Sequence, residues 1–336
     1  MSGPTRVTVL GSGSWGTAFA AVTADAGCQA TVWGRDHDVV AEIDGAHRNS
    51  RYLPDVELPA ALHATTDAAA AVQAADVLVL ALPSKVLRST LGPLVTSLRP
   101  GTVLVSLSKG VELGSNRRMS EVVAEVSGVG PERVAVVSGP NLAREIALRQ
   151  PTATVVAATR EDVADRVAAA CSTDYFRPYT NTDVVGVEIA GAMKNVIALA
   201  VGMAVGLGMG DNSKASVITR GLAETARLGA ALGADPQTFS GLAGMGDLVA
   251  TCTSPLSRNR SFGEQLGLGR SVEQAAEVTR QTAEGVGSCR SLLALAGSLG
   301  VEVPITEAVA AVVTGRLRPQ ELSRLLFARA RKAEGA

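Results

Sequence analysis

The sequence predicts an α/β fold in which an N-terminal, doubly wound parallel sheet of the Rossmann type is followed by an all-helical C-terminal domain. In the first half of the chain, short apolar runs alternate with helical stretches, as expected for a parallel sheet covered by helices on both faces. From about residue 183 onward only long helical periods remain. Because 336 residues exceed the usual size of one hydrophobic core, we expect two domains, residues 1–182 and residues 183–336.

The first predicted strand, residues 6–10, runs directly into the glycine-rich turn GSGSWG and then into an alanine-rich helix. Gly11 makes the tight turn, Gly13 lets backbone amides approach a pyrophosphate, and Gly16 lets the helix pack closely against the strand. The start of the helix offers free amides and the positive end of its dipole to phosphate groups. A strand, this turn and a helix in that order predict a dinucleotide-binding site.

The second predicted strand, residues 29–33, indicates which nicotinamide cofactor binds. An acidic residue at its end would bind the ribose 2′-hydroxyl of NAD, whereas an arginine accommodates the 2′-phosphate of NADP. Arg35 stands at this end, and Asp36 and Asp38 follow closely. We therefore expect NADP(H) to be favoured, while NAD(H) and a merely solvated Arg35 stay open as alternatives.

Three further apolar runs predict strands whose following loops carry polar residues or glycine. In a doubly wound sheet ligands bind beyond the carboxyl ends of the strands, so these loops should converge on one crevice. Residues 151–179 can add strands to the same sheet. The three strands are residues 77–81, 102–106 and 134–138, and their loops are residues 83–85, 108–110 and 139–141.

The second half predicts helices at residues 184–205, 213–233, 282–299 and 305–314, with Gly233 suited to a helix C-terminus. Its longest uncharged apolar run, residues 195–210, is shorter than the roughly 20 residues that span a bilayer. Lys194 and Asp211 bracket this run. We therefore expect a buried core helix and no membrane span.

Composition excludes several classes of partner. The net charge is −1 and aromatic residues make up 3%, so the chain has neither a basic field nor stacking platforms for nucleic acid. The four cysteines lie far apart without metal-binding or redox spacing, and no apolar targeting segment precedes the first strand. These features indicate reduced thiols and a cytoplasmic location.

Lys194 is the unusual residue of the second half, because its neighbours are apolar. Burial lowers the pKa of a lysine toward the range useful for proton transfer. The alternative is a partly exposed lysine with a buried stem.

Two other segments carry chemistry that fits an anionic ligand. Asp247 follows three glycines, where a ligand can approach the backbone, and Ser257-Arg-Asn-Arg260 offers guanidinium groups suited to a phosphate or carboxylate. The alternatives are a helix-capping aspartate and a solvated basic turn.

Together these segments resemble bacterial NAD(P)-dependent glycerol-3-phosphate dehydrogenases over essentially the whole chain. The chain departs from the family pattern at Asn141-Leu142, where Ser/Thr-Phe is more familiar, and at Thr282, where an aliphatic residue is common. The matching motifs are GSGSWGT at residues 11–17, RNSRYLP at 48–54, SKGVE at 108–112, SGPNLARE at 138–145, GAMKNVIA at 191–198, GMGD at 244–247, SRN at 257–259 and AEG at 283–285.

The resemblance implies roles for individual residues. Lys194 would be the proton donor and acceptor, with Asp247 beside it in the catalytic site. The implied substrate contacts are Lys109, Gly139, Asn141, Lys194, Asp247, Ser257, Arg258 and Asn259, of which the last three would hold the phosphate. The implied cofactor contacts are Gly11, Gly13, Ser14, Trp15, Gly16, Arg35, Lys109, Ala143, Arg258 and Glu284.

The implied reaction is reversible hydride transfer between NAD(P)H and dihydroxyacetone phosphate, giving sn-glycerol 3-phosphate for phospholipid synthesis, with no metal required. A homodimer is compatible with the resemblance. One alternative is another two-domain NADP-dependent hydroxyacid dehydrogenase that uses a histidine. It is disfavoured because the only histidines, His37, His47 and His63, all precede the helical half. The other alternative is a non-catalytic NADP-sensing module, which would not need a buried lysine.

Overall fold

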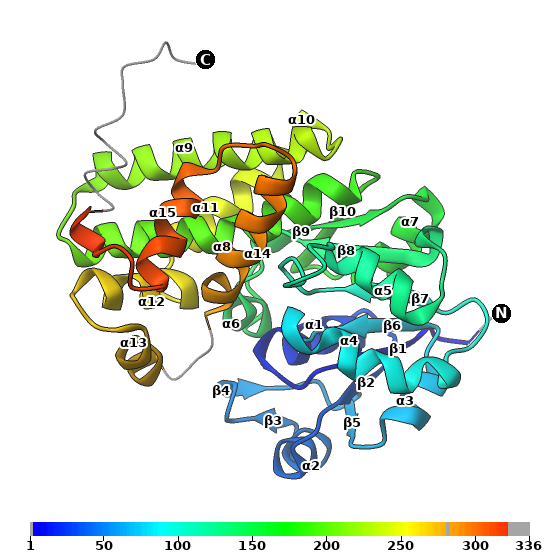
Figure 1. Ribbon diagram of the computed structural model, residues 1–336. Coiled ribbons are helices and arrows are strands. Elements are labelled where there is room, and N and C mark those ends of the chain that lie inside the picture. Colours follow the sequence, from blue (N-terminus) through cyan, green and yellow to red (C-terminus); the bar gives the residue numbers. More distant parts are fainter. Residues whose placement is uncertain (1–2, 280–282, 322–336) are drawn as a thin grey trace.

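The computed structural model describes residues 3–279 and 283–321, which form a large sheet and an adjoining group of helices (Figure 1). The sheet has eight strands in the order β10-β9-β8-β7-β6-β1-β2-β5. Its strands are β1 (Arg6–Leu10), β2 (Gln29–Trp33), β5 (His63–Thr65), β6 (Val77–Leu80), β7 (Val103–Ser106), β8 (Val134–Ser138), β9 (Thr152–Ala158) and β10 (Phe176–Asn181).

The prediction of a doubly wound parallel sheet is confirmed for most of the sheet and wrong at one edge. Strands β5, β2, β1, β6, β7 and β8 are parallel to one another, but β9 pairs with β8 antiparallel, and β10 follows the direction of β9. Between β8 and β9 the chain forms only the short helix α6 (Ala143–Ala147), which lies against α1 (Ser14–Asp25). β9 therefore starts at the same end of the sheet at which β8 finishes.

Alternate residues of the central strands build a core on each face of the sheet. Val7 and Val9 of β1 belong to a cluster with α1, α2 (His37–Ala46), α6 and α7 (Glu161–Ala170). Leu10 belongs to the opposite cluster, with α3 (Ala68–Ala74), α4 (Ser84–Leu91) and α5 (Met119–Ser127). The uninterrupted apolar runs of the sequence therefore correspond to strands buried on both faces.

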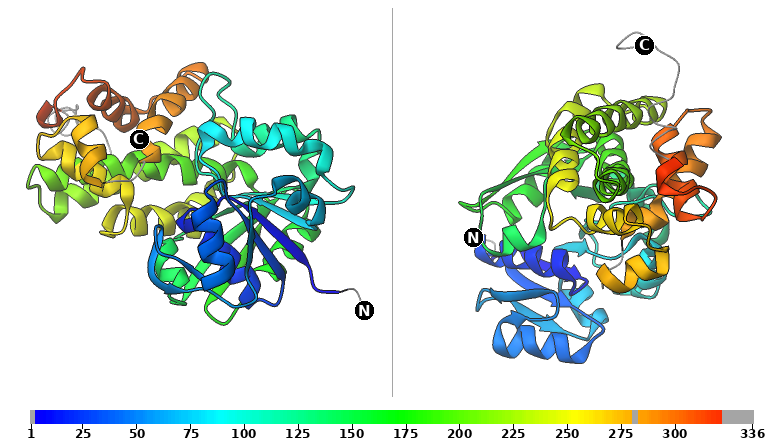
Figure 2. Two further views of the ribbon diagram at one scale, coloured as in Figure 1. Left: turned by 90° about the horizontal axis from the view of Figure 1, so that it is seen from below. Right: turned by 90° about the vertical axis from the view of Figure 1, so that its left-hand side faces the viewer.

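The remaining helices gather at one side of the sheet around α8 (Val184–Gly206), as two further views show (Figure 2). By length and composition α8 could cross a membrane, but 89% of its most apolar window is buried inside the protein. It is therefore the core helix that the sequence predicts. Its neighbours are α9 (Asp211–Ala231), α10 (Pro236–Ser240), η3 (Leu242–Gly246), α11 (Asp247–Thr253), α12 (Arg258–Gly267), α14 (Glu284–Ser298) and α15 (Pro304–Val313), while α13 (Val272–Thr279) packs against α12.

Glycines let α8 and α12 approach each other closely. A Cβ atom on Gly202 would lie 2.0 Å from the carbonyl oxygen of Arg260, and one on Gly263 would lie 2.2 Å from that of Leu199. No larger residue fits at either position without moving the backbone. This contact fixes the start of α12, and with it Arg258, relative to the helix that carries Lys194.

The predicted long helices lie within a few residues of those observed, and Gly233 has the positive φ of +81° expected just after α9. Thr282 lies outside the described residues. Several short elements were not predicted from the sequence: the hairpin of β3 (Arg48–Asn49) and β4 (Leu53–Glu57), the 3-10 turns η1 (Gly92–Ser97) and η2 (Pro131–Arg133), and the short helices between α9 and α14.

Candidate active site

The glycine-rich turn has the geometry that a dinucleotide needs. A Cβ on Gly11 would lie 2.4 Å from the carbonyl oxygen of Ala81, and one on Gly16 would lie 2.0 Å from that of Gly11. At Gly13 the space is open, and no side chain caps the first turn of α1. Trp15 has a buried indole N–H that finds no partner among the described residues. The turn thus presents free donors on an open side, which fits a bound pyrophosphate.

At the end of β2, Arg35 and Asp36 differ in what their side chains do. The Asp36 carboxylate accepts hydrogen bonds from the backbone N–H groups of Asp38 (3.1 Å) and Val39 (3.3 Å), and it pairs with Arg51 (2.7 Å). It therefore caps α2 and has a cationic partner. Arg35 is exposed, and no ion pair or hydrogen bond of its side chain is found with the described residues.

The centre of the site is a buried aspartate held between two lysines from different parts of the chain. Lys109, in the loop after β7, donates to Asp247 Oδ2 at 2.7 Å and to the carbonyl oxygen of Gly139 at 3.2 Å. Lys194, on α8, donates to Asp247 Oδ1 and to Thr251 Oγ1, the latter at 2.8 Å. Asp247 is 1% exposed and Lys194 is 8% exposed, so this charge cluster is almost removed from water.

Burial and charge set the protonation of this cluster. Burial lowers the pKa of Lys194 to about 8, although the neighbouring Asp247 carboxylate acts in the opposite direction. Burial alone would raise the pKa of Asp247, but Lys109 and Lys194 together hold it below its ordinary value. Near neutral pH the cluster therefore contains a carboxylate and a lysine that can give up its proton at modest cost.

The predicted convergence of the strand-end loops is confirmed. Lys109 reaches the loop after β8 at Gly139, and a Cβ on Gly110 would lie 3.2 Å from the Oγ atom of Ser84, the first residue of α4, which follows the loop after β6. Asn141 donates to Thr154 Oγ1 at 3.0 Å, while its Oδ1 is buried without a partner among the described residues. Asn141 thus offers a free acceptor two residues after Gly139, and Ala143 follows as the first, partly buried residue of α6.

The segment around Arg258 combines a structural serine with an exposed arginine. Ser257 caps α12 by accepting from the N–H of Arg260 at 3.3 Å, and Arg258 follows as the first, exposed helical residue. Asn259 is turned inward: it donates to Asn195 Oδ1 at 2.9 Å and accepts from the N–H of Gly285 at 3.0 Å. It therefore ties the start of α14 to α8. Burial raises the pKa of the neighbouring Glu284, against the effect of Arg258.

Sequence reasoning missed three polar residues of the site. Thr251 accepts a hydrogen bond from Lys194 and donates one to Asp247, which stands one helical turn before it. Asn195 is the partner of Asn259. Asn49, which is fully buried in the missed hairpin, donates to the Ser12 carbonyl oxygen and to Thr17 Oγ1, both at 2.9 Å, and so holds the glycine-rich turn. The one-turn spacing from Asp247 was a usable signal for Thr251. Asn49 stood in the matching motif of residues 48–54, but nothing in that motif indicated its contact with the glycine-rich turn.

Comparisons with known proteins agree over the length of the chain. Models of the N-terminal and C-terminal parts of NAD-dependent glycerol-3-phosphate dehydrogenase match residues 6–164 and 183–324. Proteins named glycerol-3-phosphate dehydrogenase (NAD(P)+) from Streptomyces coelicolor and Streptomyces avermitilis are 60% and 59% identical over 334 residues, which is 99% of this chain and of each relative. A crystal structure of glycerol-3-phosphate dehydrogenase from Coxiella burnetii superposes with a TM-score of 0.93 at 36% identity, covering 97% of this chain and 99% of that one.

A nucleotide-binding turn and a buried lysine at one edge of this sheet, together with these matches, define an NAD(P)-dependent dehydrogenase. Because two family models cover most of its length and its relatives match it from end to end, the chain belongs to the NAD-dependent glycerol-3-phosphate dehydrogenase family. The resemblance drawn from the sequence motifs is confirmed, and membership decides against the hydroxyacid dehydrogenase alternative.

Proposed function

We propose that the chain interconverts dihydroxyacetone phosphate and sn-glycerol 3-phosphate. The observation that carries the proposal is the buried cluster of Lys109, Asp247 and Lys194 at the sheet edge where the strand-end loops meet. Two ammonium groups against one carboxylate leave an excess positive charge in a nearly dry site. A small anionic substrate would balance that charge.

Lys194 is the residue we assign to proton transfer at the substrate C2 oxygen. With its pKa lowered to about 8, its ammonium group is the main form at neutral pH and can protonate the oxygen of the carbonyl as the alcohol forms. In the reverse direction the neutral amine accepts the hydroxyl proton. A bound nicotinamide cofactor supplies or removes the hydride at C2. Asp247 keeps the Nζ atom of Lys194 fixed through its Oδ1 atom.

We propose the other substrate contacts from the residue types that the sequence places in the site. We assign Lys109, the backbone of Gly139 and Asn141 to the polar end of the substrate near the reacting carbon. Arg258 can clamp the phosphate bidentately, with Ser257 and Asn259 fixing the start of its helix. Because Asn259 is engaged on both its oxygen and its nitrogen, a positioning role for it is better supported than the direct phosphate contact expected from the sequence.

For the cofactor we propose NADP(H) over NAD(H). Asp36 caps α2 and pairs with Arg51, which weakens the repulsion between its carboxylate and a 2′-phosphate. Arg35 beside it is exposed and available. The residues that would hold the dinucleotide are the glycine-rich turn with Ser14 and Trp15, and further along Lys109, Ala143, Arg258 and Glu284.

We also propose a division into a dinucleotide-binding domain of residues 1–182 and a helical domain of residues 183–336. The cysteines of the described chain are free thiols, which supports a cytoplasmic location, where the product would supply phospholipid synthesis. A homodimer is the assembly we would test for by light scattering.

The decisive experiment follows NADPH absorbance with and without dihydroxyacetone phosphate, and then repeats the assay with NADH. We expect substrate-dependent oxidation that is faster with NADPH at limiting cofactor. Binding of NADPH without any turnover would overturn the proposal and favour the non-catalytic module instead.

A further inference from the structure

The loop that carries Lys109 is tied at its far end to the helix that carries Lys194. The loop connects β7 to α5, with Lys109 near its start and Arg118 at its end. Arg118 donates to Glu188 Oε2 at 2.8 Å, and Glu188 is the fifth residue of α8. This ion pair therefore joins the two halves of the chain close to the active site.

Glu188 makes more than one bond to that loop end. Its Oε1 accepts from the backbone N–H of Ser120 at 2.8 Å, and its Oε2 also accepts from Ser120 Oγ at 2.6 Å. Glu188 is 7% exposed, and burial raises its pKa while Arg118 and Ser120 act against that effect. A carboxylate buried with this many donors is held in one position, and its loss leaves them unpaired.

The two ends of the loop are also tied to each other. Val111 and Arg118 form an antiparallel bridge, and the N–H of Glu112 donates to the carbonyl oxygen of Arg117 at 2.9 Å. Val111 is 3% exposed and packs in the core of the helical part, with Ile189 of α8. Fixing Arg118 therefore fixes Val111, which stands two residues after Lys109.

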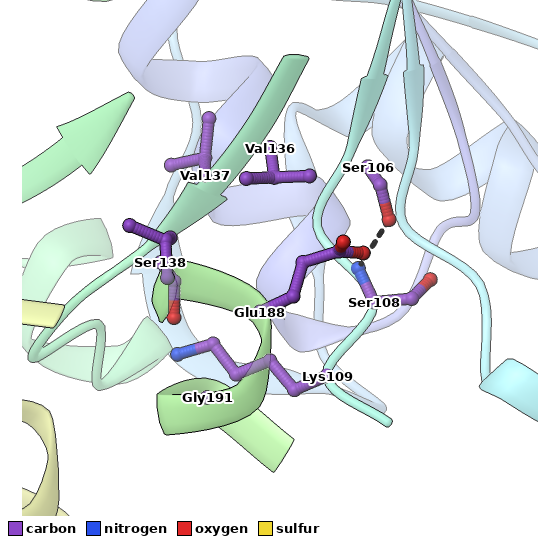
Figure 3. A pocket seen from close by; sticks show the side chains of 9 residues that line it. Ser106, Ser108, Lys109, Val136, Val137, Ser138, Glu188 and Gly191 are labelled. Carbon is purple, nitrogen blue, oxygen red and sulfur yellow. Dashed lines mark hydrogen bonds between the residues drawn. The ribbon is translucent and has the colours of Figure 1, made fainter. Parts of the chain in front are cut away.

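Glu188 and Lys109 also line the same small pocket, as the close-up in Figure 3 shows. Gly191 lies on α8, three residues after Glu188. A Cβ on Gly191 would lie 3.6 Å from Lys109 Cγ, so the stem of Lys109 packs against this helix. Glu188, Gly191 and Lys194 are spaced by three residues and lie along one side of α8.

We propose that Glu188 is a positioning residue, which sets the place of Lys109 relative to Lys194 through Arg118 and Ser120. One rigid helix then carries both the reacting lysine and the anchor of the loop that brings the second lysine to Asp247. This inference rests on the proposed role of Lys109 in holding substrate. A displacement of about 1 Å at a reacting group can cost about a hundredfold in rate, so the anchor matters for catalysis.

The test compares Glu188→Gln with Glu224→Gln as a matched control. Glu224 is also buried, its pKa is also raised by burial, and it accepts from the N–H groups of Ile305 and Thr306 and from Thr306 Oγ1 at the start of α15. It does not touch the loop. Both variants remove a buried charge that caps a helix, but only the first releases Lys109.

We expect Glu188→Gln to lower kcat/KM for dihydroxyacetone phosphate by about a hundredfold and to speed amide hydrogen exchange in residues 107–118. Glu224→Gln should leave both near the wild-type values. If Glu188→Gln does not fold, Ser120→Ala takes its place. It removes the 2.6 Å bond to Glu188 and the 3.2 Å bond from Arg118 but leaves the Arg118–Glu188 ion pair, so it should cause a smaller change in the same direction.

A double-mutant cycle with Lys109→Ala separates this inference from the role on which it rests. If Glu188 acts through Lys109, adding Glu188→Gln to Lys109→Ala should cost less than about threefold. Losses that multiply, or unchanged exchange in the loop, would overturn the inference alone. A Lys109→Ala variant with wild-type kinetics would overturn the role of Lys109 and this inference with it.

Discussion

Replacing Asp247 by asparagine tests the electrostatics of the site most directly. The substitution keeps the shape of the side chain but removes the only carboxylate in contact with Lys109 and Lys194 among the described residues. An opposite charge in contact shifts a pKa by about 1–3 units. Without it, burial and the positive charge of Lys109 both lower the pKa of Lys194, from about 8 to roughly 5–7. We therefore expect Lys194 to be largely neutral at pH 7 in Asp247→Asn.

The sign of the pH dependence follows from the form that reacts. Reduction needs the Lys194 ammonium, so kcat/KM for dihydroxyacetone phosphate should fall as the pH rises through the pKa of Lys194, near 8 in the wild type. Oxidation needs the neutral amine, so kcat/KM for sn-glycerol 3-phosphate should rise over the same range. In Asp247→Asn both the fall and the rise of kcat/KM with pH should move to roughly pH 5–7.

The assay is a pH–rate profile in both directions at saturating cofactor, with Thr251→Val as the control. Thr251 also contacts Lys194, at 2.8 Å, but it is neutral, so its removal should move the limbs much less. Limbs that stay near pH 8 in Asp247→Asn would refute this account, since Lys194 would not then be the titrating group.

Three other substitutions separate the remaining roles. Lys194→Ala should lower kcat by about 10²- to 10⁴-fold with little change in the Kd for NADPH measured by fluorescence. A near-normal kcat would contradict the role of Lys194 in proton transfer. Arg35→Ala should raise KM for NADPH about 10- to 100-fold more than KM for NADH, because a charge-assisted bond contributes about 1.5–3 kcal/mol; equal effects would mean that Arg35 does not contact the 2′-phosphate. Arg258→Ala, assayed at saturating NADPH, should depress kcat/KM for dihydroxyacetone phosphate far more than for unphosphorylated dihydroxyacetone, with partial rescue by lysine; equal losses would point to a role in the fold or at the cofactor.

The elements that the sequence predicted best are those whose signal is local. The strand β1, its glycine-rich turn and α1 follow one another within twenty residues, and each glycine has a steric reason that a short window contains. The core helix α8 is apolar except at Glu188, Lys194 and Asn195, so both its helical structure and its burial could be predicted. The reversal of β9 was not, because an apolar strand has the same pattern in either direction.

The pairing of charges in the site could not be predicted in the same way, because it depends on contacts between distant segments. Lys109 and Asp247 are 138 residues apart, and Lys194 and Asp247 are 53 apart. Considered alone, Asp247 was better explained as a helix-capping residue, yet in the structure it is the first residue of α11, makes no capping bond to the described residues and faces two lysines.

The partners of Glu188 could not be predicted from the sequence either. In the sequence it is one acidic residue at the start of an apolar helix, where a favourable interaction with the helix dipole would be explanation enough. Its partners lie 68 and 70 residues earlier, and they become visible only when the loop after β7 is folded against α8. Local sequence patterns indicate which helix or strand a residue occupies. They do not indicate its distant partner, although a buried charge requires one because burying it unpaired is costly. Among the described residues, the buried charged side chains are Glu188, Lys194, Glu224 and Asp247, and each marks a contact between distant segments that local pattern alone does not reveal. Glu188 contacts the loop of Lys109 for that reason.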